Sequence, residues 1–245
     1  MDEVDDRHFR MEDWDPIFRA ELYQAEFFAT DAWADGRDRL VPAWDSSIAT
    51  ELAHLRWLKE HERPGHAGEI VRELQVPMII GYWYELLKFD PKSHRLTTEL
   101  LHASIFLAGA AATYVKRRFN RARPWVLAPD LLPPSQLLPG LPAYPGGHAA
   151  QVYLMAHVLT SLVPGKVRKN KIENVADNVA LNRERGGFNY PSDTVAGKQL
   201  ASRIFGILTT KECPLFRATL KEAAKEWRLA ASPYRNFLEK SGLPV

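Results

Sequence analysis

The stretch LLHASIFLAGAAATYVKRRFNRARP, residues 100–124, joins an apolar run directly to a cluster of five cations within eight residues. The apolar part, residues 100–115, contains His102 and is shorter than the roughly 20 residues that cross a bilayer. It therefore predicts a buried helix, which we expect over about residues 94–119 with Ser93 as its N-terminal cap.

Apolar residues recur every three to four positions on both sides of this stretch, which is the spacing of amphipathic helices. Pro77 should kink or split one of these helices. No segment alternates in the manner of a strand, so we expect an all-α fold, a helical bundle. The expected helices span residues 16–34, 46–61, 67–89, 94–119, 148–163, 170–184, 192–209 and about 215–230, followed by a short irregular end.

Prolines are concentrated between residues 124 and 145, where seven occur and no helical periodicity is sustained. This composition predicts a long ordered loop, and loops of this length in compact domains usually have a function. A second basic stretch, KVRKNK at residues 166–171, is most simply interpreted as a solvated loop.

Length and composition predict a single domain, residues 1–245, with 46% apolar and 25% charged residues. The formal net charge of +2 creates no strong overall field, so neither nucleic acid nor an anionic membrane is expected as an obligatory partner. One cysteine, Cys213, excludes an intramolecular disulfide and a thiolate zinc site. The acidic N-terminus lacks the basic start and apolar run of a secretory signal, so we expect a cytoplasmic protein.

Three separated segments combine positive charge, glycine or histidine with a turn at an expected helix end. The cations of residues 116–123 alone would indicate only a favourable helix C-terminus. The second segment, YPGGH at residues 144–148, precedes a helix, where glycine lets backbone N–H groups approach an anion. The third, residues 182–193, alone would be an ordinary turn with an acidic residue, Asp193, in the next helix.

Together these segments resemble the signature of the type 2 phosphatidic acid phosphatase superfamily, which includes bacterial acid phosphatases and vanadium-dependent haloperoxidases. That signature reads KxxxxxxRP, then PSGH, then SRxxxxxHxxxD. The matching residues are Lys116 and Arg123-Pro124 in the first part, Pro145, Gly147 and His148 in the second, and Arg183 and Asp193 in the third. The resemblance spans about residues 100–205, and we expect the helices of residues 1–95 to pack on this region.

The resemblance implies a helical bundle whose loops hold a phosphate monoester or a similar oxyanion. Lys116, Arg123 and Arg183 would bind the anion's oxygens, with help from the Gly147 N–H. His148 would protonate the leaving group. It also implies that no cofactor is required, that phosphate or vanadate can occupy the site, and that a homodimer is possible. A membrane-bound lipid phosphatase is not expected, because those relatives need several spanning helices and the sequence offers none.

Two departures from the signature bear on the chemistry. Gly146 replaces the serine of the second part and removes one hydroxyl donor, a loss that costs on the order of 3 kcal/mol of transition-state stabilisation at well-studied sites. Asn189 replaces the histidine that attacks phosphorus or coordinates vanadium, and that the following aspartate, here Asp193, orients. An amide nitrogen has no available lone pair, so the ordinary phosphohistidine reaction is expected to be impaired.

Several explanations of Asn189 stay open at this point. The chain can be an enzyme redirected to another reaction, a phosphatase whose nucleophile has been replaced deliberately, a haloperoxidase-like protein, or an inactive oxyanion-binding protein. A function of another class, nucleic-acid binding through KRRFNRAR and KVRKNK, would show a steep salt dependence, but the near-neutral net charge disfavours it.

Two further groups of residues are candidates for a metal site and for a substrate pocket. His54, His61 and His66 are spaced by seven and five residues, which does not place all three on one helical face, so a metal site is not expected. The aromatic residues of the N-terminal third fit a pocket for an apolar substrate tail and fit ordinary core packing equally well.

Overall fold

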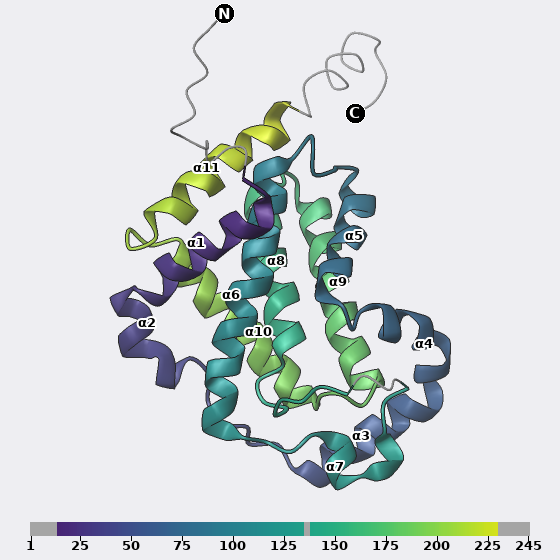
Figure 1. The fold of residues 1–245 in the computed structure, drawn as a ribbon. Coiled ribbons are helices and arrows are strands. Elements are labelled where there is room, and N and C mark those ends of the chain that lie inside the picture. Colours follow the sequence, from purple (N-terminus) through teal and green to yellow (C-terminus); the bar gives the residue numbers. More distant parts are fainter. Residues whose placement is uncertain (1–13, 135–137, 230–245) are drawn as a thin grey trace, which may run out of the picture.

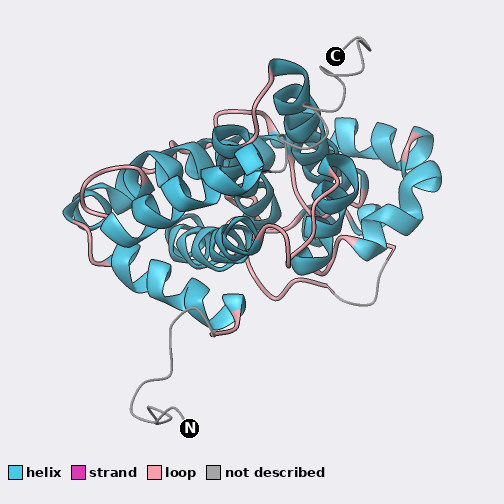
Figure 2. Ribbon diagram, turned by 90° about the horizontal axis from the view of Figure 1, so that it is seen from above, coloured by secondary structure: helices cyan, strands magenta, loops and turns pink. Residues whose placement is uncertain are grey.

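The structure is a computed structural model that describes residues 14–134 and 138–229, and within these ranges it contains helices and loops but no β-strand (Figures 1 and 2). The predicted all-α class is confirmed for this part of the chain. The helices are α1 (Pro16–Phe28), α2 (Asp31–Gly36), the 3-10 turn η2 (Arg37–Arg39), α3 (Ile48–His61), α4 (Arg63–Arg72), α5 (Val76–Leu87), α6 (Arg95–Phe119), α7 (Pro124–Leu127), the 3-10 turn η3 (Pro129–Leu131), α8 (Gly147–Leu162), α9 (Lys166–Arg185), α10 (Pro191–Leu208) and α11 (Pro214–Leu229).

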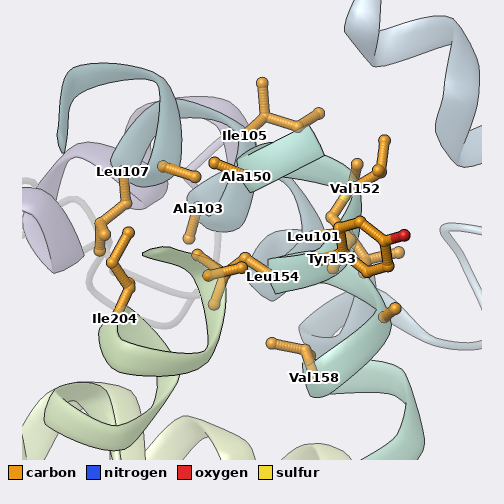
Figure 3. Packing of buried hydrophobic residues seen from close by; sticks show 14 of the residues in the cluster. Leu101, Ala103, Ile105, Leu107, Ala150, Val152, Tyr153, Leu154, Val158 and Ile204 are labelled. Carbon is orange, nitrogen blue, oxygen red and sulfur yellow. The ribbon is translucent and has the colours of Figure 1, made fainter. Parts of the chain in front are cut away.

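Helices α6, α8 and α10 form the centre of the molecule (Figure 1). Figure 3 shows side chains of all three pointing toward one another, among them Leu107 of α6, Leu154 of α8 and Ile204 of α10, each fully buried. The closest approach is made by Gly197 of α10, where an added Cβ would lie 2.5 Å from the carbonyl oxygen of Gly146. Glycine therefore sets how closely α10 packs against the start of α8.

Helices α1 and α11 cover one side of α6 and are fixed to it through buried polar contacts (Figure 1). Tyr23 of α1 donates to the carboxylate of Glu99 on α6. The carboxylate of Glu226 on α11 accepts hydrogen bonds from the first backbone N–H groups of α6, at 2.8 and 3.0 Å. The prediction that Ser93 caps α6 is therefore wrong, because a carboxylate from a distant helix occupies that role.

The predicted helix over residues 16–34 is two helices, α1 and α2, that meet at Thr30. The hydroxyl of Thr30 accepts from the backbone N–H of Trp33 and caps α2. This local hydrogen bond competes with continuation of the helix, and the apolar spacing alone does not reveal it.

The predicted helix over residues 67–89 is also two helices, α4 and α5, because Pro77 lies in the first turn of a new helix. The stretch of residues 166–171, expected as a solvated loop, instead forms the first turns of α9. Most of its side chains are exposed, so its polarity reflects a solvated helix face rather than a loop. The predicted loop over residues 124–145 contains the short turns α7 and η3, while the irregular end predicted after residue 230 lies outside the described residues.

Four helix ends converge at the lower end of the molecule in Figure 1: the C-termini of α6 and α9 and the N-termini of α8 and α10. The segment between α6 and α8 crosses this end, where the Ala143 N–H donates to the Arg121 carbonyl and the Gly146 N–H donates to the Asp193 carbonyl. No helix in the described ranges has the length and apolar character that would let it cross a membrane.

Candidate functional site: a basic cavity where four helix ends meet

A cavity of about 300 Å³ opens where these helix ends converge. Six of the residues that the resemblance singles out lie on its wall: Lys116, Arg123, Gly147, His148, Arg183 and Asn189. The rest of the wall is largely apolar and includes Val76, Ala112, Pro139, Leu141 and Phe188. None of the described residues on this wall carries a carboxylate, so the cavity presents three cationic side chains without an acidic partner on its surface.

Lys116 ends the buried part of α6 and points its ammonium group at the loop that follows. Its Nζ donates to the carbonyl oxygens of Pro142, Ala143 and Pro145 at 2.7, 2.8 and 2.6 Å. Burial, followed by the charge of Arg123, lowers the pKa of Lys116 to about 7, and Asp193 opposes this shift. Lys116 therefore holds the loop in place and acts on the cavity mainly through its charge.

Arg123 is also held by backbone carbonyls. Its Nε donates to the carbonyl oxygen of Leu141 at 2.8 Å, and its Nη1 donates to that of Phe188 at 2.7 Å. Burial lowers the pKa of Arg123 to about 10, so its guanidinium remains charged near neutral pH. These contacts tie the loop after α6 to the turn after α9 and fix the guanidinium on the cavity wall.

Arg183, in the last turn of α9, is almost completely buried. Its guanidinium lies 3.9 Å above the ring centroid of Phe188, and its Nη1 donates a long hydrogen bond of 3.4 Å to the carbonyl of Ile70. Burial lowers the pKa of Arg183 to about 10, while the nearby Glu73 raises it. Lys116 and Arg123 donate short hydrogen bonds to backbone carbonyls, whereas Arg183 donates only this long one. Arg183 is therefore the cation that is best placed to bind an anion directly.

The start of α8 contributes backbone donors. Gly147 is the first residue of this helix and lies on the cavity wall, and the preceding cap residue, Gly146, provides no side-chain hydrogen bond. The first N–H groups of a helix lack intrahelical acceptors and favour anions. Gly146 lies behind this wall: it is buried and its own N–H donates to the Asp193 carbonyl at 2.8 Å.

A serine could not replace Gly146 without movement of the backbone. An added Cβ would lie 2.9 Å from the carbonyl oxygen of Asp193, shorter than real Cβ contacts. The glycine at this position is therefore explained by close packing of α8 against α10, which the comparison with the PSGH motif alone does not reveal.

His148 lines the cavity one residue into α8. Its Nε2 lies 3.1 Å from the carbonyl oxygen of Glu73, and this contact favours the tautomer that carries its proton on Nε2. Burial, followed by the charge of Arg183, lowers the pKa of His148 to about 3. The imidazole is therefore neutral near neutral pH, and an anion bound beside it would shift its pKa upward.

Asn189 lies in the turn between α9 and α10, and its amide is fully engaged. Its Nδ2 donates to the carbonyl of Ala143 and to the carboxylate of Asp193, both at 3.1 Å, and its Oδ1 accepts from Arg123 at 3.3 Å. Asp193 is completely buried behind this amide and does not line the cavity. Asn189 thus occupies the position between the aspartate and the cavity that the resemblance assigns to histidine.

Sequence reasoning assigned no role to two residues that are linked to Asp193, Arg121 and Glu51. The Arg121 guanidinium donates to Asp193 Oδ1 at 2.8 Å and to Glu51 Oε2 at 2.6 Å, and it lies 3.9 Å above the ring of Tyr190. Burial alone would raise the pKa of Glu51, but hydrogen bonds from the Ser192 N–H and from Arg121 hold this pKa below its ordinary value. Burial raises the pKa of Asp193, and the charge of Arg121 counteracts this shift.

Glu73, also unremarked in the sequence, lies behind Arg183 at the end of α4. Its Oε1 accepts from Asn182 Nδ2 at 3.0 Å and from the Tyr82 hydroxyl at 3.3 Å, whereas Oε2 has no hydrogen-bond partner within the described residues. Burial raises the pKa of Glu73 to about 7. Glu73 belongs to the surroundings of the cavity only because tertiary packing places it next to Arg183.

The three histidines considered for a metal site make separate contacts. His61 stacks on Trp57, His66 pairs with Glu69 at 3.2 Å, and His54 lies 3.9 Å from Glu184. In the part of the chain that the structure describes, no group of three or more histidine, cysteine or acidic side chains is arranged to hold a metal ion.

Comparisons with known proteins add no family assignment: no family model matches the chain, and no curated protein matches it significantly. The superfamily resemblance therefore depends on the motif residues and their spacing alone.

Proposed function

We propose that this cavity binds the tetrahedral oxyanion of a phosphate monoester or a similar compound, and that the chain is a member of the acid phosphatase and haloperoxidase superfamily lacking the usual nucleophile. The observation that carries the proposal is the convergence of Lys116, Arg123 and Arg183 with the N-terminus of α8 on one cavity. A multiply charged oxyanion compensates three buried cations, and the unpaired N–H groups of the helix provide donors for it.

The electrostatics of the cavity favour such a ligand. Burial lowers the pKa of Lys116, Arg123 and Arg183, which means that all three charged forms are disfavoured by their surroundings. A bound dianion would reverse this effect by pairing with them. Binding is therefore expected to raise these pKa values and to take up protons near neutral pH, chiefly at Lys116.

The chemistry available without the usual histidine is limited. The Asn189 amide nitrogen cannot attack phosphorus, and both of its hydrogens are already donated. Water would have to attack the phosphorus directly, while His148, once an anion has raised its pKa, would transfer a proton to the leaving oxygen. We expect such hydrolysis to be slow and ligand binding to be largely retained.

Vanadate is a tetrahedral oxyanion like phosphate, so we propose that it binds in the same cavity without a bond to a protein nitrogen. A haloperoxidase-like reaction is less favoured than phosphate binding, because Asn189 offers no imidazole nitrogen to vanadium. A purely binding role is the remaining alternative, and turnover measurements separate it from a slow enzyme.

The test compares hydrolysis of an aryl phosphate by the native chain, Asn189→His and Asn189→Gln, with and without orthovanadate. A histidine Nδ1 attached at this position lies where the present amide meets Asp193, and its Nε2 would extend toward the cavity. We expect Asn189→His alone to gain vanadate-inhibited activity, by several orders of magnitude over the native chain.

The amide control, Asn189→Gln, changes the length of the side chain without supplying a nucleophile, so it should remain as inactive as the native chain. Absence of activity in all three proteins, together with absence of phosphate binding, would refute the proposed function.

A further inference from the structure

A second groove, of about 430 Å³, adjoins the oxyanion cavity. The two share three wall residues, Thr113, Lys116 and Leu141, so they lie next to each other along the C-terminal part of α6 and the loop after it. The second groove is completed by Tyr114, Arg117 and Pro142. Like the cavity, it has no carboxylate among the described residues that line it.

Two arginines provide positive charge at this groove. The guanidinium of Arg117 lies 5.6 Å from the ring centroid of Tyr114, and that of Arg37, at the end of α2, lies 5.4 Å from the same centroid. Both side chains are exposed, and neither forms an ion pair within the described residues. Trp33 packs against the edge of Tyr114 and holds this ring in place.

One side of the surface between the two positive regions is apolar. Leu141 and Pro142 form one side of the groove, and Leu141 continues into the cavity next to Pro139. A ligand that extends from the cavity into the groove therefore meets cations at both ends, with Leu141 and Pro142 along one side and Thr113 and Lys116 at the junction.

We propose that this groove binds a second anionic group on the alcohol part of the substrate, so that the preferred ligand is a phosphate-type ester with a short apolar spacer and a carboxylate or second phosphate. This inference rests on the proposed function, because it places the first anion in the oxyanion cavity. Arg117 is the specificity-determining residue, with Arg37 adding charge over the same ring.

Favourable interaction with the C-terminus of α6 is the competing explanation of Arg117. Arg118 provides the matched control: it is exposed in the same helical turn and lies over Phe119, but it does not line the groove. If helix stabilisation were the whole role of these cations, replacement of Arg117 and Arg118 by glutamine would have similar effects on ligand binding and on stability.

The experiment measures, by calorimetry at low ionic strength, the affinity of inorganic phosphate, 4-carboxyphenyl phosphate and 4-carbamoylphenyl phosphate. The two esters differ only in whether the second group is charged. We expect the native chain and Arg118→Gln to bind the carboxyphenyl ester about two- to fivefold more tightly than the carbamoyl ester, as for an exposed charge pair. Arg117→Gln should abolish this preference, and its affinity for inorganic phosphate should stay unchanged.

Equal affinity of the native chain for both esters, or an unchanged preference in Arg117→Gln, would overturn the second-anion site while leaving the oxyanion cavity in place. Failure of inorganic phosphate and both esters to bind would refute the proposed function itself. The two hypotheses are thereby tested separately in one set of titrations.

Discussion

Asn189 donates its side-chain amide to the carboxylate of Asp193, 3.1 Å away and one helical turn further along the chain. The same carboxylate accepts from Arg121 and from the backbone N–H of Tyr190, both at 2.8 Å. Asp193 is therefore satisfied by three donors, and Asn189 fulfils the hydrogen-bonding role of a histidine at this position without its nucleophilicity. This hydrogen bond fixes the Asn189 amide between Asp193 and the cavity.

Arg121→Met should destabilise the fold strongly. The substitution leaves the buried carboxylates of Glu51 and Asp193 without their shared cation, and breaking a buried pair in this way costs about 3–5 kcal/mol. Urea denaturation should show a correspondingly lower free energy of unfolding. Arg118→Met, at an exposed position of the preceding helix, should change it by less than about 0.5 kcal/mol. Equal midpoints for the two variants would disprove the structural role of Arg121.

Gly146→Ser should destabilise the protein rather than add a donor for the oxyanion. Its Cβ would meet the Asp193 carbonyl at 2.9 Å, and overpacking of this kind costs about 1–3 kcal/mol. In Gly147→Ala, by contrast, the nearest atom to the added Cβ is Lys116 Cε at 3.8 Å, an ordinary contact. Thermal unfolding of both variants checks this difference, and a Gly146→Ser protein as stable as Gly147→Ala would contradict it.

Glu73→Gln should stabilise the protein above neutral pH. Because burial raises the pKa of Glu73 from 4.5 to about 7, the folded state holds a proton that the unfolded chain has already released between these values. Stability contributed by this group therefore falls as the pH rises from about 4.5 to 7, by up to about 3 kcal/mol at 1.36 kcal/mol per pKa unit. Glutamine removes this penalty and keeps the hydrogen bond from Asn182.

Denaturation of native and Glu73→Gln proteins at pH 4 and pH 8 measures this effect. The variant should gain stability at pH 8 and little at pH 4, where Glu73 is protonated in both states. The exposed Glu85 of α5 lines the same surface depression as Glu73, so Glu85→Gln serves as the control and should show no such pH-dependent gain. A Glu73→Gln gain that is equal at both pH values would show that ionisation of Glu73 is not its cause.

Much of the fold could be predicted from the sequence, because apolar spacing is a local signal. The pattern around residues 94–119 predicts α6 to within a residue at its start, and Pro164-Gly165 marks the end of α8. The break at Thr30 and the cap of α6 by Glu226 could not be predicted in this way. Both depend on specific hydrogen bonds, which do not change the spacing of apolar residues in the sequence.

The grouping of residues that belong to the spaced motifs could be predicted, and six of them line one cavity: Lys116, Arg123, Gly147, His148, Arg183 and Asn189. Their hydrogen-bond partners were not predictable. Lys116 directs its ammonium to three loop carbonyls, and Arg121 pairs with Glu51 from a helix 70 residues earlier, contacts that only the packed fold creates. The same applies to Glu73, which approaches Arg183 through the packing of α4 against α9.

Binding of inorganic phosphate, measured by isothermal titration calorimetry, tests the central claim most directly. The proteins to compare are the native chain, Arg183→Gln, Arg183→Lys and, as a control, Lys198→Gln, whose side chain is exposed and paired with Asp177 outside the cavity. Circular dichroism would first verify that each variant is folded. We predict that the native chain and Lys198→Gln bind phosphate with similar affinity, that Arg183→Gln binds at least about tenfold more weakly, and that Arg183→Lys is intermediate. Absence of phosphate binding by the native chain, or equal affinity in a folded Arg183→Gln, would contradict the claim that this cavity is an oxyanion site.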